Sequence, residues 1–345
     1  MIRKVRISAM CKCADKFFCF AKDINLLFEL DANSFKTHVL CSLPESEKGG
    51  LIDKILLWDN KIILIPLNAQ NIYIYDLNST LLESIELPVR NGTIYFKFFW
   101  GCIRNDKLFL IGSYYPAIVR VDLHTKKIHE INVYNDRLNK QKQIGDCFTR
   151  KSIVEKENEL FIASAISNEV LIYNMVTDEY RWEKVGSDGN RYSGIAWDGK
   201  AFWLSPRKHT SIVRWILGVG IEEFDISRDY QEGNNFGGVV YYDDKIYILS
   251  LESDFSLIFD VSKGQFNKLK TGEVSCFEVI DDKLFCQFDD RLIHVMTREE
   301  EKIVECDWEG VYDTILKSDM KWNYFFREGS LFDLKMYLKE IYKNN

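Results

Sequence analysis

The residues with the widest chemical repertoire in this chain form one short run, Ser205-Pro206-Arg207-Lys208-His209-Thr210. The guanidinium of Arg207 could hold a carboxylate or a phosphate through two parallel hydrogen bonds, and Lys208 would add positive charge. His209 could serve as an acid or a base, because imidazole titrates near neutral pH. The run therefore predicts an anion-binding or acid–base site, and an ordinary solvated loop is the alternative.

A second candidate is the aromatic run Tyr114-Tyr115-Pro116. Its two adjacent rings could form a stacking wall for a sugar, a base or a peptide side chain, with packing at the rim of the fold as the alternative. Arg191 and Tyr192 precede another strand-like run, and we expect them to lie near Arg207. The remaining polar candidates for ligand contact are Asn68, Asn168, Glu252, Asp254, Asp289 and Asp290.

Signals for a defined catalytic centre are weak. Cys11-Lys12-Cys13 would place two thiols on one face of a strand, but no matching Cys or His cluster follows, so we predict no metal site. The sequence contains no P-loop, dinucleotide fingerprint or Gly-X-Ser-X-Gly motif, and we expect no cofactor. Acidic residues could support glycoside hydrolysis, but the spacing of their carboxylates cannot be read from sequence.

The elements that must position these residues repeat along the chain. A short polar turn followed by an apolar run occurs seven times, with its second turn residue at 16, 61, 107, 159, 200, 245 and 283. Fifteen positions later most repeats end a second apolar run with Asp or Asn. These residues are Asp31, Asp76, Asp122, Asn174 and Asp260; Trp215 takes the position in the fifth repeat, and the seventh ends near Thr297.

Each repeat divides into four short strands. In residues 51–89, the runs LIDKILLW, KIILIPL, IYIYD and LLESIELP are separated by turns rich in Asp, Asn and Ser. Four strands in each unit of 40–50 residues predict an all-β seven-bladed β-propeller spanning 1–308. A six-bladed ring with an irregular N-terminal segment and a tandem pair of β-sandwiches are the alternatives. The expected blades are 4–44, 51–89, 95–134, 147–186, 191–227, 236–270 and 274–308.

The polar turn before an apolar strand, as in Asp106-Lys107-LFLI, and strands such as IYIYD resemble the repeats of the Kelch, NHL and YVTN groups of β-propellers. The resemblance covers residues 5–308 and is architectural. The Kelch glycine pair occurs only once, as Gly237-Gly238, and the WD40 Trp-Asp pair is not a repeated mark. The resemblance implies that ligands bind on the face formed by the second-to-third-strand turns and the connections between blades.

The C-terminal segment 309–345 follows a different pattern. Apolar residues from Leu331 to Ile341 recur with helical spacing after Ser330, which could cap the helix. We expect a helical extension that packs on the propeller, with docking of a partner as the alternative.

Charge and composition narrow the functional classes. The formal net charge of −7 argues against nucleic acid as a partner. No apolar run is long enough for a membrane helix, and charged residues interrupt the N-terminal apolar run, so we expect a cytoplasmic protein without a membrane partner. The nine scattered cysteines indicate a reduced protein without disulfides.

We therefore expect a propeller that binds a peptide or protein partner. A hydrolase or lyase that uses His209, and a sugar-binding protein that uses Tyr114 and Tyr115, are the alternatives.

Overall fold

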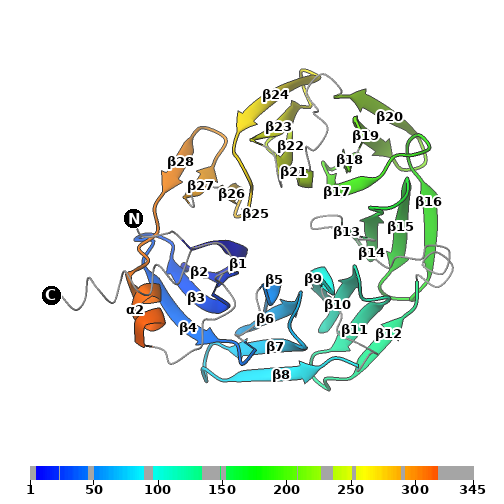
Figure 1. The fold of residues 1–345 in the computed structure, drawn as a ribbon. Coiled ribbons are helices and arrows are strands. Elements are labelled where there is room, and N and C mark those ends of the chain that lie inside the picture. Colours follow the sequence, from blue (N-terminus) through cyan, green and yellow to red (C-terminus); the bar gives the residue numbers. More distant parts are fainter. Residues whose placement is uncertain are drawn as a thin grey trace. The chain divides into compact units, whose positions relative to one another are not determined.

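The chain folds as an all-β seven-bladed β-propeller, which confirms the fold class and the blade number expected from the repeats. The computed structural model describes residues 5–22, 24–45, 50–88, 96–133, 148, 153–207, 209–226, 236–250, 254–288 and 292–317. They form seven antiparallel sheets, each made of four strands that are consecutive in the sequence (Figure 1). The six-bladed and β-sandwich alternatives are wrong, because the first repeat builds a regular four-stranded sheet like the others.

The strands of each blade follow in chain order. Blade 1 contains β1 (Ile7–Cys13), β2 (Lys16–Ala21), β3 (Leu26–Asp31) and β4 (Thr37–Ser42), and blade 2 contains β5 (Ile52–Trp58), β6 (Lys61–Pro66), β7 (Asn71–Asp76) and β8 (Leu82–Glu86). Blade 3 contains β9 (Phe98–Arg104), β10 (Lys107–Gly112), β11 (Ile118–Asp122) and β12 (Ile128–Ile131), and blade 4 contains β13 (Ile153–Lys156), β14 (Glu159–Ala163), β15 (Glu169–Asn174) and β16 (Tyr180–Lys184). Blade 5 contains β17 (Tyr192–Trp197), β18 (Phe202–Pro206), β19 (Ser211–Ile216) and β20 (Gly220–Asp225), and blade 6 contains β21 (Phe236–Tyr242), β22 (Lys245–Ser250), β23 (Phe255–Asp260) and β24 (Gln265–Lys270). Blade 7 contains β25 (Cys276–Ile280), β26 (Lys283–Gln287), β27 (Ile293–Met296) and β28 (Glu301–Val304).

The blades fall into two compact units. Unit 1 comprises Met1–Tyr95 and Ser275–Asn345 and holds blades 1, 2 and 7. Unit 2 comprises Phe96–Val274 and holds blades 3, 4, 5 and 6. Both units bury the second strand of each blade almost completely, because sheets or loops cover its two faces. In β6, for example, Ile62 to Ile65 are fully buried.

The first repeated sequence marker is a tight hairpin turn. Asn105-Asp106, Asp243-Asp244 and Asp281-Asp282 each place two consecutive residues at positive φ, between 49° and 55°. Asn and Asp tolerate this left-handed conformation better than other residues with a side chain, and its twist matches that of the flanking strands. The polar pair therefore selects the turn between the first and second strands.

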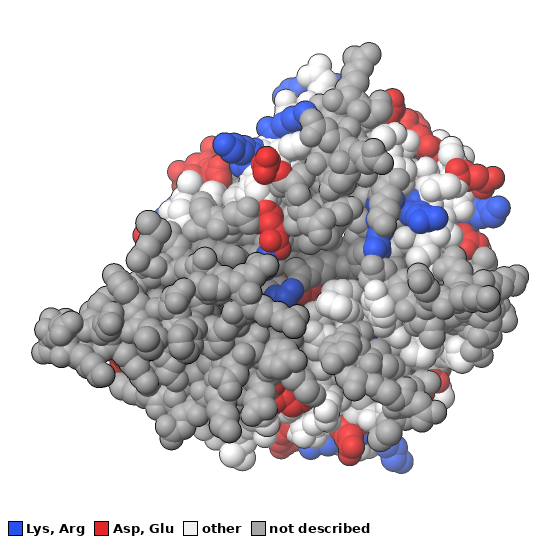
Figure 2. Space-filling view, viewed as in Figure 1, with Lys and Arg blue, Asp and Glu red and all other residues white. Residues whose placement is uncertain are grey.

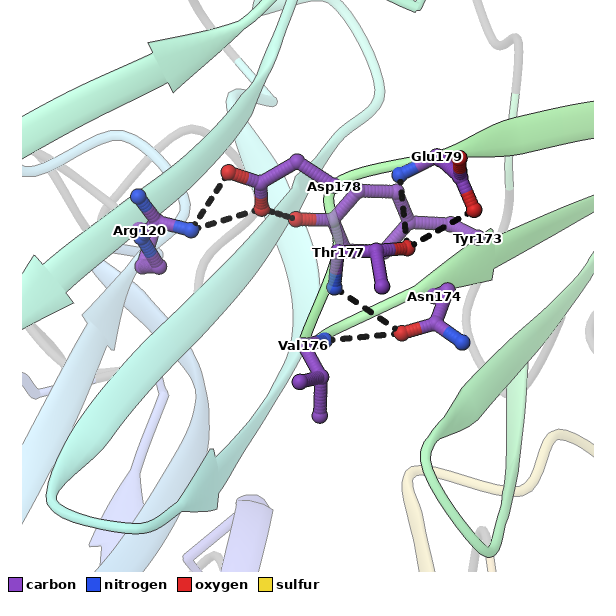
Figure 3. A network of polar contacts seen from close by, with 7 residues as sticks. All are labelled: Arg120, Tyr173, Asn174, Val176, Thr177, Asp178 and Glu179. Carbon is purple, nitrogen blue, oxygen red and sulfur yellow. Dashed lines mark hydrogen bonds and ion pairs between the residues drawn. The ribbon is translucent and has the colours of Figure 1, made fainter.

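The second marker fixes the turn between the third and fourth strands. Oδ1 of Asp76 accepts hydrogen bonds from the backbone N–H groups of Asn78 and Ser79, both at 2.9 Å. Asn174 makes the same contacts with Val176 and Thr177 in blade 4 (Figure 3). Donated hydrogen bonds, chiefly from the backbone in the first three and from Ser262 in the fourth, lower the carboxyl pKa of Asp31, Asp76, Asp122 and Asp260.

An ion pair joins blades 3 and 4 within unit 2. Nη1 of Arg120 on β11 lies 2.6 Å from both carboxylate oxygens of Asp178, which also accepts the hydroxyl hydrogen of Tyr173 at 2.6 Å (Figure 3). Burial, reinforced by the bond to Asp178, raises the pKa of Tyr173. The neutral phenol of Tyr173 thus donates to Asp178, and the carboxylate of Asp178 accepts hydrogen bonds from blade 3 and blade 4.

Blades 1 and 7, from opposite ends of the chain, are joined by one buried amide within unit 1. Oε1 of Gln287 accepts the N–H of Ile7 at 2.7 Å, and Nε2 donates to the carbonyl of Val5 at 3.0 Å. On the outer side, the N–H and hydroxyl of Thr37 donate to the carbonyl of Asp307 at 3.1 and 2.6 Å. The junction therefore combines these hydrogen bonds and the isolated β-bridge between Lys36 and Asp307 with the apolar core that the two blades share, since each sheet has four strands of its own.

The helix α2 (Glu309–Lys317) follows that bridge and packs against β4 (Figure 1). Asp307 caps its start, because Oδ1 accepts the N–H of Glu309 at 3.0 Å. The helix expected after Ser330 lies outside the described residues. No helix in the described ranges is long and apolar enough to cross a membrane.

Candidate functional site

The first and third strands of every blade begin at the same end of the sheet, which we call the upper end. A repeated hydrogen bond ties this end together, from the N–H after the second strand to the carbonyl before the first strand. It joins Lys22 to Arg6 at 2.9 Å, Leu67 to Leu51 at 2.8 Å, Ser113 to Lys97 at 2.7 Å and Arg207 to Arg191 at 2.8 Å. The candidate residues next to this hydrogen bond in blades 3 and 5 therefore lie on backbone of the same local geometry.

Among the described residues, five blades carry a β-bulge at this end of their first strand, where one extra residue has no partner on the second strand. In four of them the extra residue is small or short and is buried. These residues are Ser8, Asp53, Ser193 and Gly237. Blade 3 differs, because its extra residue is Phe99 and the ring is half-buried. The bulge thus brings a large aromatic side chain to a partly exposed position.

Phe99 belongs to a group of three rings that we call the aromatic cluster: Phe96, Phe99 and Tyr114. The ring of Phe96 stacks on Phe99 with centroids 6.1 Å apart and lies 5.9 Å from the ring of Tyr114. Phe96 is 46% exposed, while Phe99 and Tyr114 are half-buried. An offset arrangement of rings with open edges can accept a further apolar or aromatic group.

The backbone of Phe96 is in a conformation that favours glycine. Its φ is 52°, and the residue at the same position of blade 2, two before the first strand, is Gly50 with φ 59°. A residue with a side chain in this left-handed region is less stable than glycine by roughly 1–2 kcal/mol. The fold therefore holds an exposed ring where glycine would be less strained.

Tyr115 lies on the other side of this loop. The prediction that Tyr114 and Tyr115 form a stacking wall together is therefore wrong for Tyr115. Tyr115 is 1% exposed, its ring packs on Phe98 at 4.9 Å, and its hydroxyl donates to Glu130. Consecutive residues point to opposite sides here, so Tyr114 reaches the surface and Tyr115 enters the core. Only Tyr114 of the pair can meet a ligand.

The basic run of blade 5 is brought beside Arg191, as expected. The carbonyl of Arg191 accepts the N–H of Arg207 at 2.8 Å and Nε2–H of His209 at 2.6 Å. Nδ1 of His209 accepts the N–H of Ser211 at 3.1 Å. Both ring nitrogens are thus engaged by the backbone, and burial lowers the pKa of His209.

This geometry corrects the acid–base prediction for His209. A neutral imidazole with both nitrogens bonded to the main chain fixes the loop and has no nitrogen left to exchange a proton with a substrate. Tyr192 is also corrected, because it is fully buried and its hydroxyl donates to the carbonyl of Val185. Arg191, exposed, and Arg207, half-buried, remain as groups that a ligand can reach.

The other polar candidates hold the loops or lie outside the described residues. Nδ2 of Asn68 donates to Gly50 at 3.1 Å, and Nδ2 of Asn168 donates to Gly186 at 3.0 Å. The carbonyl of Asp254 accepts the N–H of Thr271 at 3.2 Å, while its side chain is exposed. Lys208, Glu252, Asp289 and Asp290 lie outside the described residues.

The sequence did not lead us to predict two residues of the aromatic cluster, Phe96 and Phe99, although the repeat contains a signal for Phe99. Ser8, Asp53, Phe99 and Gly237 each stand eight positions before the second residue of the repeated turn. Alignment of the repeats on that turn would have set Phe99 against three small or short polar residues. The exposure of Phe96 has no comparable sequence signal, because it depends on the conformation of one residue.

In the face shown in Figure 2, basic and acidic side chains alternate over the part that is not grey. Within the described ranges, no three His, Cys, Asp or Glu side chains are grouped so that they could hold a metal ion.

Comparison with known proteins supports the fold alone. No protein-family model and no curated protein matches the sequence. Among solved structures, streptogramin B lyase is similar, with a TM-score of 0.61 and 11% identity over 88% of this chain and 95% of that chain. Catalytically inactive virginiamycin B lyase from Staphylococcus aureus with quinupristin gives 0.64 and 13% over 84% and 94%, and YCF48 from Cyanidioschyzon merolae gives 0.65 and 11% over 87% and 98%. The resemblance to Kelch, NHL and YVTN repeats accordingly stays at the level of architecture.

Proposed function

We propose that this chain is a binding propeller that recognises a peptide or protein partner through the upper ends of the blades in unit 2. The aromatic cluster is the observation that supports the proposal best. Phe96, Phe99 and Tyr114 form a partly exposed apolar surface, and clustered aromatic residues of this kind are common anchors of protein interfaces.

Two unfavourable features of the cluster support a role in binding. The Phe96 ring remains 46% exposed, and its backbone keeps a left-handed φ of 52°. Strained residues are frequent at functional sites, because the surrounding structure holds them there for a purpose other than stability. A partner that covers the cluster would recover the free energy of burying its rings.

The structural neighbours include lyases, but the local geometry favours binding over catalysis at this site. The histidine that could have served as an acid or base, His209, has both nitrogens bonded to the backbone. The same face retains aromatic rings and two arginines, which recognise partners in many binding sites.

Selection of peptides tests this proposal. Random short peptides displayed on phage are selected on the immobilised full chain, and the dissociation constants of the selected peptides are measured by fluorescence anisotropy. We expect Phe96→Ser and Tyr114→Ser each to weaken binding about tenfold or more, which is the usual effect of removing an aromatic anchor. The matched control is Val219→Ser, because Val219 is 80% exposed in the same unit, in the turn between the third and fourth strands.

Two results would contradict the proposal. One is a selection that yields no peptide binding above background. The other is a set of peptides whose affinity is the same for Phe96→Ser, Val219→Ser and the unaltered chain.

A further inference from the structure

The three rings of the aromatic cluster form a row with Phe96 in the middle. The centroid of the Phe96 ring lies 6.1 Å from that of Phe99 and 5.9 Å from that of Tyr114. Within the described part of the chain, Phe99 contacts no ring other than Phe96, so the cluster is not a closed triangle. A partner that lies along the row therefore meets one ring after another at intervals of about 6 Å.

This interval fits two of the three regular conformations of a peptide. Side chains four residues apart on an α-helix lie on one face and are separated by about 6 Å along its axis. Alternate side chains of an extended strand share one face at about 6.6–6.8 Å. In a polyproline II helix the residues on one face are three apart, which is about 9 Å. The spacing of the rings thus fits a helix or a strand.

The hydrogen bonds of the neighbouring loop favour the helix. A bound strand gains affinity from main-chain hydrogen bonds to an open sheet edge. In the loop that carries Tyr114, the N–H groups of Gly112, Ser113, Tyr114 and Ala117 donate to carbonyls within blade 3, and Pro116 has no N–H. A strand on this loop would find few main-chain donors for its carbonyls, whereas a helix forms its backbone hydrogen bonds internally.

We propose that the partner segment is an amphipathic α-helix that lays its apolar face along the row of Phe99, Phe96 and Tyr114. Apolar or aromatic side chains at positions i and i+4 of the helix pack against neighbouring rings. The three ring side chains are uncharged at neutral pH, so burial of apolar surface supplies the affinity, chiefly over Phe96, which is 46% exposed. This inference rests on the proposed function and names the conformation and chemistry of the partner.

Changes within the selected peptides test the helix without altering the fold of the chain. The selection uses peptides of about 15 residues, because shorter helices rarely form in water. An alanine scan of each peptide, read by fluorescence anisotropy on the full chain, should find its sensitive positions three and four residues apart. Proline at an insensitive central position should weaken binding about a hundredfold, because it breaks a helix. Alanine at the same position is the matched control and should change affinity less than about twofold.

The register of the helix provides a second measurement. Tyr114 is the last ring of the row, so it packs against one anchor of the peptide and not against the anchor at the other end. We expect Tyr114→Ser to make one anchor insensitive to alanine, while the other anchor keeps its full effect. In Val219→Ser both anchors should keep their effects, because Val219 lies in a turn of blade 5 and not in the row.

The outcomes separate this inference from the proposed function. Peptides that depend on Phe96 but tolerate the central proline, or whose anchors occupy alternate positions, overturn the helix in favour of an extended partner and leave the proposed function standing. Peptides that ignore Phe96 overturn the proposed function itself. A dimer of the unaltered chain in sedimentation velocity that is lost in Phe96→Ser would overturn the inference in favour of a second copy of this chain.

Discussion

Replacing Phe96 by glycine and by alanine separates the strain of its backbone from the packing of its ring. Both changes remove the same aromatic side chain, and they differ mainly in how well the new residue tolerates a φ of 52°. Alanine is less stable than glycine in this region by roughly 1–2 kcal/mol, whereas the larger conformational entropy of unfolded glycine offsets about 0.4–1 kcal/mol of that difference. We therefore expect Phe96→Gly to be more stable than Phe96→Ala by about 0.5–1 kcal/mol.

Urea unfolding followed by tryptophan fluorescence measures this difference as a shift in midpoint at constant slope. Leu81 supplies the matched control, because it is exposed and is not among the residues with positive φ. At Leu81 the order should reverse, with the alanine variant the more stable one. If Phe96→Ala were as stable as Phe96→Gly or more so, the argument that the fold tolerates strain to present this ring would be refuted. Both Phe96 variants should lose peptide binding equally.

Three further predictions concern the scaffold. Gln287→Leu should lower the free energy of unfolding by roughly 2–5 kcal/mol, because it leaves the N–H of Ile7 and the carbonyl of Val5 buried without their partner. Urea unfolding measures this change in stability. An equal loss of stability in the exposed control Gln265→Leu would contradict the reasoning. Gly186→Ala should destabilise more than Gly189→Ala, since both have positive φ but only the first would place a Cβ 2.7 Å from the hydroxyl of Tyr192; equal unfolding midpoints would contradict this. The lowered carboxyl pKa values of Asp31, Asp76 and Asp122 stabilise the fold above the unfolded pKa of about 3.9, and this contribution is lost as the pH falls through the folded values. Replacing the three by Asn should therefore make the unfolding midpoint less sensitive to acid between pH 7 and pH 3, and an unchanged acid sensitivity would argue against it.

Several features of this protein were accessible from sequence because they are local. The Asn and Asp residues of the repeated turns select left-handed or side-chain-bonded hairpins within a few residues of themselves, so their spacing predicts four strands in each repeat. The closeness of Arg191 and Arg207 also followed from the repeat, because the first and second strands of a blade are neighbours in the sequence and in space.

The tertiary structure decided which of the candidate side chains reach the surface. Tyr114 and Tyr115 are adjacent and chemically identical, but only the second packs on Phe98 and bonds Glu130. Both ring nitrogens of His209 form hydrogen bonds with main-chain groups, at Arg191 and Ser211. No sequence motif indicates such main-chain partners.

The aromatic cluster shows the same limit. Phe96 and Phe99 lie in an apolar run that predicts a buried strand by composition. Their exposure follows from a bulge and from one left-handed residue, which depend on how the first strand meets the second. Sequence thus determined the repeated hairpins through short-range hydrogen bonding, and the packing of strands and loops around those hairpins decided which rings a partner can touch.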